Sequence, residues 1–173
     1  MPVYKIKTER LLLRPLTIED ADAVWKWVSD ERVAMYMIYP TYTDKEKLIE
    51  WLQSIQEFDG EYLFGYERLS DGELIGSGSI GPDKKEGFWG FGYNLRYDCW
   101  GLGYATEAAK AMIDFAKNVF GITHFRSRHA EPNTASGHVM EKCGLHFVGY
   151  GEFKKLDGSS KMRSKEYEGI INV

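Results

Sequence analysis

Apolar and polar positions follow two different periods along the first third of the chain. Residues 10–16 (RLLLRPL) form a short apolar run that predicts a strand. Two stretches with helical spacing follow: one opens at Thr17 with Asp20 as its capping-box partner, and the other opens at Thr43 with Glu46 in that role. The apolar faces of these predicted helices contain Ala21, Val24, Trp25 and Val28, then Leu48, Ile49, Leu52 and Ile55.

Turn residues divide the middle of the chain. The aromatic stretch 35–42 is broken by Pro40 and predicts a loop, and Gly60 is the expected end of the second helix. Three strands are predicted next, separated by the turn-rich segments SDG and GPDKK, at about residues 61–69, 73–81 and 86–95. Short separators of this kind favour an antiparallel meander.

The clearest helix spans residues 102–120. Its polar face carries Glu107, Lys110, Asp114 and Lys117, and its apolar face carries Ala105, Ala108, Ala109, Met112, Ala116 and Val119. A strand at 122–129, a short helix at 133–143 that ends at Gly144, and two further strands complete the order βααβββαβαββ. No repeat or linker divides the sequence, so we expect a single α+β domain over residues 1–173.

Composition narrows the function classes. The chain has 173 residues, of which 43% are hydrophobic, and a formal net charge of -4, which argues against nucleic acid as the main partner. Cys99 and Cys143 form neither a metal-ligand pattern nor a CxxC motif, so we expect free thiols and no metal site. The N-terminus lacks the apolar segment of a signal peptide, and no apolar run reaches membrane-spanning length. The expected location is the cytoplasm.

A glycine loop, Trp100-Gly-Leu-Gly-Tyr-Ala-Thr-Glu-Ala108, lies between a predicted strand and the clearest helix. Free backbone N–H groups at a helix start bind anions, and Gly101 and Gly103 lack the Cβ atoms that would keep a phosphate away from the backbone. The loop lacks the Gly-Lys-Ser/Thr run of a P-loop, and Thr106 stands where the Rossmann fingerprint needs a third glycine or alanine. A phosphate cradle is predicted, and a glycine-rich turn without a ligand is the alternative that the loop alone leaves open.

Three segments together resemble one known family. The runs are Thr8 to Arg14 (TERLLLR), Gly92 to Leu95 followed by Trp100 to Ala108, and Asn133 to Ser136 followed by Glu141 to Leu145 (EKCGL). In this order they are similar to the motifs of the GNAT superfamily of N-acetyltransferases, in its RimJ/RimL branch. Trp at position 100, where the wider superfamily usually has Gln or Arg, is typical of that branch.

The resemblance implies a GNAT fold whose mixed, mostly antiparallel sheet is flanked by helices. The strand that ends near Leu95 would splay from the strand at 122–129, and the pantetheine arm of acetyl-coenzyme A would lie in that gap. A backbone N–H near Leu95 would face the thioester carbonyl as an oxyanion donor. The implied cofactor-binding residues are Leu95, Trp100, Gly101, Leu102, Gly103, Tyr104, Ala105, Thr106 and Asn133. The alternative for Asn133 is that it caps its helix, and it could do both.

The catalytic groups depart from the wider superfamily. Met140 aligns with the frequent general-acid tyrosine and cannot donate a proton. The resemblance implies that Ser136, at the position of a serine in the RimJ/RimL branch, protonates the departing thiolate; a serine that only caps the helix or faces solvent is the alternative. The strand that leads to Leu95 contains no carboxylate, which leaves His129 and Glu131 as the nearest candidates for a base and the base itself unassigned. We hypothesise that four aromatic residues line one wall of the acceptor site: Tyr36, Tyr39, Tyr42 and Trp89.

The resemblance implies an acetyl-CoA-dependent N-acetyltransferase in which a primary amine attacks the thioester directly. The acceptor amine could belong to a protein N-terminus, an amino acid, a polyamine or an antibiotic, and the sequence does not choose among them. A non-catalytic acetyl-CoA-binding regulatory module is the alternative. No membrane or nucleic-acid partner is expected, and both a monomer and a homodimer are compatible with the sequence.

Overall fold

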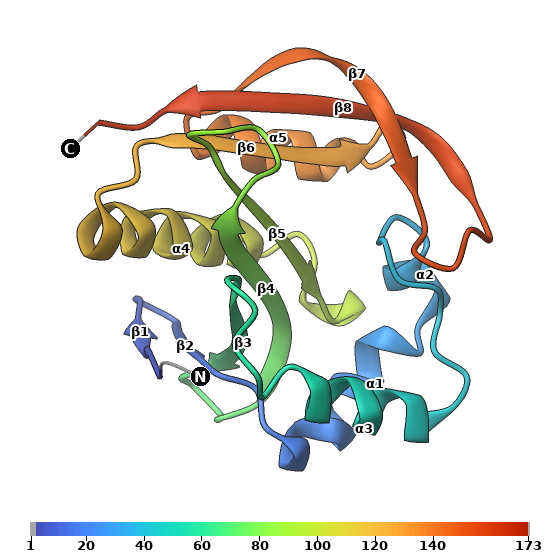
Figure 1. The fold of residues 1–173 in the computed structure, drawn as a ribbon. Helices are drawn as coiled ribbons and strands as arrows, with labels where there is room; N and C mark the ends of the chain where they lie inside the picture. The colour runs from blue at the N-terminus through green and yellow to red at the C-terminus, as the bar shows by residue number, and fades with distance from the viewer. Residues whose placement is uncertain (1–2, 173) are drawn as a thin grey trace.

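The fold centres on one eight-stranded sheet, seen in a computed structural model that describes residues 3–172 (Figure 1). The sheet order is β1-β2-β3-β4-β5-β6-β8-β7. The strands are β1 (Ile6–Lys7), β2 (Leu11–Arg14), β3 (Tyr62–Arg68), β4 (Leu74–Pro82), β5 (Trp89–Leu95), β6 (His124–Ala130), β7 (His146–Lys154) and β8 (Lys161–Ile170). Neighbouring strands are antiparallel except for β5 and β6, which are parallel.

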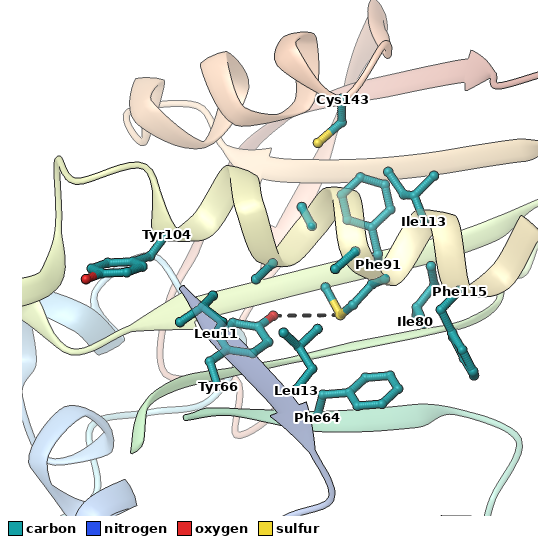
Figure 2. Packing of buried hydrophobic residues seen from close by; sticks show 14 of the residues in the cluster. Leu11, Leu13, Phe64, Tyr66, Ile80, Phe91, Tyr104, Ile113, Phe115 and Cys143 are labelled. Carbon is teal, nitrogen blue, oxygen red and sulfur yellow. Dashed lines mark hydrogen bonds between the residues drawn. The ribbon is translucent and has the colours of Figure 1, made fainter. Parts of the chain in front are cut away.

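Helices cover both faces of the sheet. They are α1 (Ala21–Val28), α2 (Glu31–Ala34), α3 (Lys45–Ser54), α4 (Tyr104–Phe120) and α5 (Thr134–Lys142), with two 3-10 turns, η1 (Ile18–Asp20) and η2 (Tyr97–Cys99). Successive strand residues point to opposite faces. On β3, accordingly, Phe64 packs in the core with α4, whereas Leu63 packs against the smaller core of α1 and α3. Figure 2 shows the larger core, in which the Tyr66 hydroxyl contacts the Met112 sulfur at 3.7 Å.

The central strands part after a short parallel contact. β5 and β6 are paired only where Trp89 faces Phe125 and Gly90 faces Arg126. The Ser127 hydroxyl then donates a hydrogen bond to the Phe91 carbonyl at 2.7 Å, and the described parts of the two strands form no register pair beyond it. The expected splay of the strand pair is therefore present, and it opens toward Leu95.

Helix boundaries account for most differences from the sequence-based prediction. Thr17 and Asp20 pair as expected, with the Thr17 N–H donating to the Asp20 carboxylate at 2.8 Å. The cap of α3 is Asp44 instead of Thr43, because the Asp44 carboxylate accepts the Glu46 N–H at 2.9 Å. This helix also ends at Ser54, well before Gly60.

Two further features were not predicted. Asp30 caps the short helix α2 by accepting the Arg32 N–H, and no helix was expected at that point. In α4, Val119 was assigned to the apolar face but is 47% exposed, because the last turn of the helix extends past the sheet-facing core. The element order otherwise agrees with the prediction, with the two-residue strand β1 added at the start.

Candidate active site

The glycine loop presents a row of unpaired backbone donors. Gly101 and Gly103 adopt φ angles of 74° and 83°, which an L side chain rarely tolerates, and α4 begins only after them. Of the donors in the described structure, the six N–H groups from Gly101 to Thr106 make no hydrogen bond to any backbone or side-chain acceptor. A Cβ placed on Gly101 would meet nothing within 4 Å, so the space in front of the loop is open. The geometry fits a pyrophosphate at the start of α4.

A partly buried carboxylate ties this loop to the N-terminal strand. Glu107, in the first turn of α4, accepts hydrogen bonds from the Thr8 hydroxyl at 2.6 Å, from the Arg10 N–H at 2.9 Å and from the Arg10 Nε at 2.7 Å. Burial alone would raise the pKa of Glu107, but these hydrogen bonds outweigh it and hold the pKa below its ordinary value. Glu107 is therefore a structural carboxylate and not a free base.

Arg10 also contacts the glycine loop directly. Its Nη1 donates to the Leu102 carbonyl at 2.9 Å, and its guanidinium lies 4.2 Å from the centre of the Tyr104 ring. Because the Arg10 charge is paired with Glu107 at 2.7 Å, its contribution is to fix the shape of the loop rather than to add net charge. The sequence analysis did not include Arg10 among the site residues. The sequence did contain a signal for Arg10, because Arg10 and Glu107 both lie in the segments that resemble the GNAT motifs.

Leu95 ends β5 with its N–H directed into the splay. The next residue, Arg96, donates its N–H to Ile75 of the neighbouring β4 segment at 2.7 Å. Because N–H groups along an antiparallel strand alternate in direction, the Leu95 N–H points away from β4, toward the gap. The Trp100 indole N–H donates to the Leu95 carbonyl at 3.0 Å and so fixes the end of β5 against the glycine loop.

Ser136 lies on the far side of the gap and is 8% exposed. Its hydroxyl lies 2.8 Å from the Tyr93 hydroxyl, and the Tyr93 O–H also lies within donating distance, 3.0 Å, of the Ser136 carbonyl. Burial raises the pKa of Tyr93, which keeps this phenol protonated. Tyr93 was quoted in the family motif but was not assigned a role, because nothing in the local sequence shows that its hydroxyl reaches α5. Met140 is fully buried in the core, where it has no proton to donate.

Asn133 precedes α5 and is half-buried. Its side chain makes no capping hydrogen bond to the helix, so the alternative that it caps α5 is wrong. Its amide has no hydrogen-bond partner among the described residues, and its expected contact with the cofactor remains a prediction.

The two candidate bases occupy unequal environments. His129 is 4% exposed, its Nδ1 donates to the Ala130 carbonyl at 2.7 Å, and its Nε2 has no partner in the described structure. Burial lowers the pKa of His129, so the ring is neutral at pH 7. Glu131 forms a two-pronged ion pair with Arg163 at 2.6 and 2.7 Å, which lowers the pKa of its carboxyl and weakens it as a base.

The proposed aromatic wall divides into two separate places. The Tyr39 hydroxyl donates to the Asn94 side chain at 2.6 Å, next to Leu95, and the Tyr42 ring lies 6.0 Å from the Tyr39 ring. Trp89 instead stacks on Tyr62 at the opposite end of β5. Asn94 lies five residue steps along the strand from Trp89, about 17 Å, so Trp89 lies apart from Tyr39 and Tyr42. No aromatic contact or hydrogen bond places Tyr36, which is half-buried.

Neither cysteine is activated. Both are buried, and burial raises the pKa of the Cys99 thiol and raises that of Cys143 to about 11. Within residues 3–172, no cluster of three or more His, Cys, Asp or Glu side chains is arranged to hold a metal ion. No helix in that range is long and apolar enough to cross a membrane.

Comparison with known proteins identifies the family. Residues 10–146 match the family described as "Acetyltransferase (GNAT) domain". A Bacillus licheniformis protein, "Uncharacterized N-acetyltransferase p20", is 30% identical over 156 residues, which cover 87% of this chain and 88% of the relative. The chain therefore belongs to the GNAT acetyltransferases and is an acetyl-CoA-dependent N-acetyltransferase.

Solved structures share the whole fold. A GNAT-family acetyltransferase from Bacillus anthracis superposes with a TM-score of 0.83 at 24% identity, covering 96% of this chain and 98% of the other. RimL, the ribosomal L7/L12 alpha-N-protein acetyltransferase in complex with coenzyme A, superposes with a TM-score of 0.82 at 18% identity, covering 97% and 98%. The expected α+β GNAT fold and the expected coenzyme are confirmed.

Proposed function

We propose that this enzyme, as a member of the RimJ/RimL branch, transfers the acetyl group of acetyl-CoA directly to a primary amine. The candidate acceptors are a protein N-terminus and a small-molecule amine. The observation that carries the proposal is the row of six unpaired N–H groups at the start of α4, beside a gap that has Leu95 on one side and Ser136 on the other. The protein substrate in the name of the RimL structure makes a protein N-terminus one acceptor to test.

Each part of the site has a distinct task in this reaction. The loop from Gly101 to Thr106 would hold the pyrophosphate, with Arg10 fixing the loop through the Leu102 carbonyl. The amine nitrogen bonds to the thioester carbonyl carbon, and the N–H of Leu95 would stabilise the negative charge that develops on the oxygen. The carbon–sulfur bond then breaks, the amine loses a proton, and coenzyme A leaves as a thiol.

The hydroxyl of Ser136 is the proposed donor to the departing sulfur, and solvent returns a proton to the serine oxygen as the first one leaves. Tyr93 holds that hydroxyl in place and has a raised pKa, so it supports Ser136 as a hydrogen-bond donor and does not itself release a proton readily. No carboxylate lies on β5 to take the proton of the amine, so the acceptor is proposed to lose it to solvent. The Nε2 of His129 has no hydrogen-bond partner in the described structure and lies against Gly137 of α5.

Thiol release from acetyl-CoA tests the proposal. The purified chain is incubated with acetyl-CoA and, separately, with a peptide carrying a free N-terminus, free amino acids, spermidine and an aminoglycoside, and the products are identified by mass spectrometry. We expect thiol release above the amine-free rate with at least one acceptor class, with the acetyl group on its primary nitrogen. Tight binding of acetyl-CoA without release in any mixture would instead identify a non-catalytic binding module.

A further inference from the structure

The turn between β7 and β8 is fastened to a distant loop by a lysine. We define the tyrosine loop as residues 35–42, between α2 and α3. The ammonium of Lys155 donates hydrogen bonds to three carbonyls at its edge and within it: Ala34 at 2.6 Å, Met37 at 2.8 Å and Tyr39 at 2.9 Å. The neighbouring N–H of Leu156 donates to the Ile38 carbonyl at 2.7 Å. Four hydrogen bonds thus connect segments more than 115 residues apart in sequence.

Convergence of three carbonyls on one point depends on a cation. Carbonyl oxygens carry partial negative charge and repel one another when they face a common centre. A lysine ammonium has three donors, and here every donor has an acceptor. The tyrosine loop is irregular and has few internal hydrogen bonds of its own, so the ammonium holds its backbone in this shape.

The same loop is anchored at the reaction centre by a side chain. Tyr39 donates its hydroxyl hydrogen to the Asn94 side-chain oxygen at 2.6 Å. Asn94 is held in turn by donating to the Ser77 carbonyl and hydroxyl at 2.8 and 2.9 Å. Asn94 directly precedes Leu95, the proposed oxyanion donor. A continuous set of hydrogen bonds therefore runs from Lys155 through the Tyr39 residue to the end of β5.

We propose that Lys155 is a positioning residue for the acceptor amine, because it fixes the tyrosine loop over the acceptor side of the site beside Leu95. The inference rests on the proposed function, since it concerns the same transfer. Loss of the ammonium frees the loop backbone, and the acceptor then binds a site that must be ordered on each encounter. The pyrophosphate cradle lies on other elements, α4 and Arg10, and is unaffected.

Three variants test this role. Lys155→Met removes the ammonium and keeps the length of the side chain. Lys155→Arg keeps the charge and several donors in a different shape, and Lys154→Met removes an exposed charge from the same hairpin as the matched control. Acceptor kinetics are measured with spermidine and with a peptide carrying a free N-terminal serine, and hydrogen exchange is followed over residues 34–42.

We expect Lys155→Met to raise the acceptor KM about tenfold or more, as loss of hydrogen bonds from a charged group would. The acetyl-CoA KM should stay within about twofold of the wild type, and exchange over the tyrosine loop should accelerate. Lys155→Arg should recover part of the acceptor KM, and Lys154→Met should match the wild type. If Lys155 only stabilised the fold, Lys155→Met would lower the thermal midpoint without raising the acceptor KM more than the acetyl-CoA KM.

An unchanged acceptor KM in Lys155→Met, or an equal rise in Lys154→Met, would overturn the inference. So would unchanged exchange in the tyrosine loop. If Lys155→Met fails to fold, Tyr39→Phe tests the same connection, because it removes only the hydroxyl that contacts Asn94 and should shift the acceptor KM in the same direction. Wild-type enzyme that acetylates no amine would refute the proposed function itself, which is a different result from turnover with an unchanged KM.

Discussion

The hydroxyl groups of Ser136 and Tyr93 are 2.8 Å apart, so the hydrogen bonds that one makes restrict those that the other can make. The phenol can donate either to the Ser136 hydroxyl or to the Ser136 carbonyl. When it donates to the carbonyl, the serine O–H is free to turn toward a ligand in the gap. A buried phenol with a raised pKa is a poor proton source and a stable hydrogen-bond partner.

Replacing Ser136 by alanine should lower kcat by roughly tenfold to a thousandfold, within or just below the usual worth of positioned acid catalysis. The Kd for acetyl-CoA should change little, because one neutral hydrogen bond contributes about 1 kcal/mol. Tyr93 keeps the Ser136 carbonyl as an acceptor in this variant, so the fold should persist. Single-turnover kinetics and calorimetry provide the two measurements.

Asn133→Ala is the comparison for Ser136→Ala. Its side chain makes no capping bond, so its removal should raise the Kd for coenzyme A with a smaller effect on kcat. A thermal melt of both variants separates these effects from loss of fold. Full kcat in Ser136→Ala would leave the serine as a packing residue at the start of α5.

At the scale of elements, α4 begins and ends with a glycine in the left-handed region. Gly103 precedes its first turn with φ 83°, and Gly121 follows its last with φ 70°. A side chain at either position would carry a similar backbone cost, about 1–2 kcal/mol. Only the first lies beside the unpaired N–H groups, and a Cβ there would approach the Arg10 guanidinium at 3.3 Å.

Gly103→Val and Gly121→Val therefore form a matched pair. Both should lower the free energy of unfolding, and Gly103→Val alone should raise the Kd for coenzyme A, by about tenfold or more if one charge-assisted hydrogen bond is lost. Urea titration and calorimetry measure the two quantities. Equal affinities in the pair would show that the loop does not contact the pyrophosphate.

Most helices and strands of this chain, apart from the short α2 and β1, are predictable from its local pattern, because hydrophobic period and capping chemistry act over a few residues. The start of α3 was misplaced by one residue, since Thr43 and Asp44 can both accept a capping hydrogen bond and tertiary packing selects between them. The glycine loop was predicted for the same local reason. Contacts such as Tyr39 with Asn94, or Glu107 with Thr8, join segments 55 and 99 residues apart, and no local pattern contains them.

At the scale of the whole molecule, the pH dependence of the free energy of unfolding should reveal the protonation of His129. Burial lowers the pKa of this histidine in the folded state, so the unfolded chain takes up a proton more readily. The contribution of neutral His129 to the stability of the fold is fully present above the pKa of histidine in the unfolded chain, about 6.5, and is lost as the pH falls below that value. Wild-type protein should therefore lose stability between pH 7 and pH 5.

His129→Gln should lose less stability than the wild type over that interval, because the variant has no buried ring to protonate. His146→Gln, at an exposed position, is the control and should follow the wild type. Thermal midpoints at half-unit pH steps measure the difference. Parallel curves for all three proteins would show that His129 is not what makes the fold sensitive to acid.

The sheet order has a consequence for synthesis on the ribosome. β8 lies between β6 and β7, although it is made after both. A nascent chain that has emerged only as far as β7 therefore has one side of β6 unpaired, because β8 has not yet left the ribosome. Open strand edges invite association with other chains. We expect this half of the sheet to form late, after release of β8, while the meander from β2 to β5 can assemble during elongation.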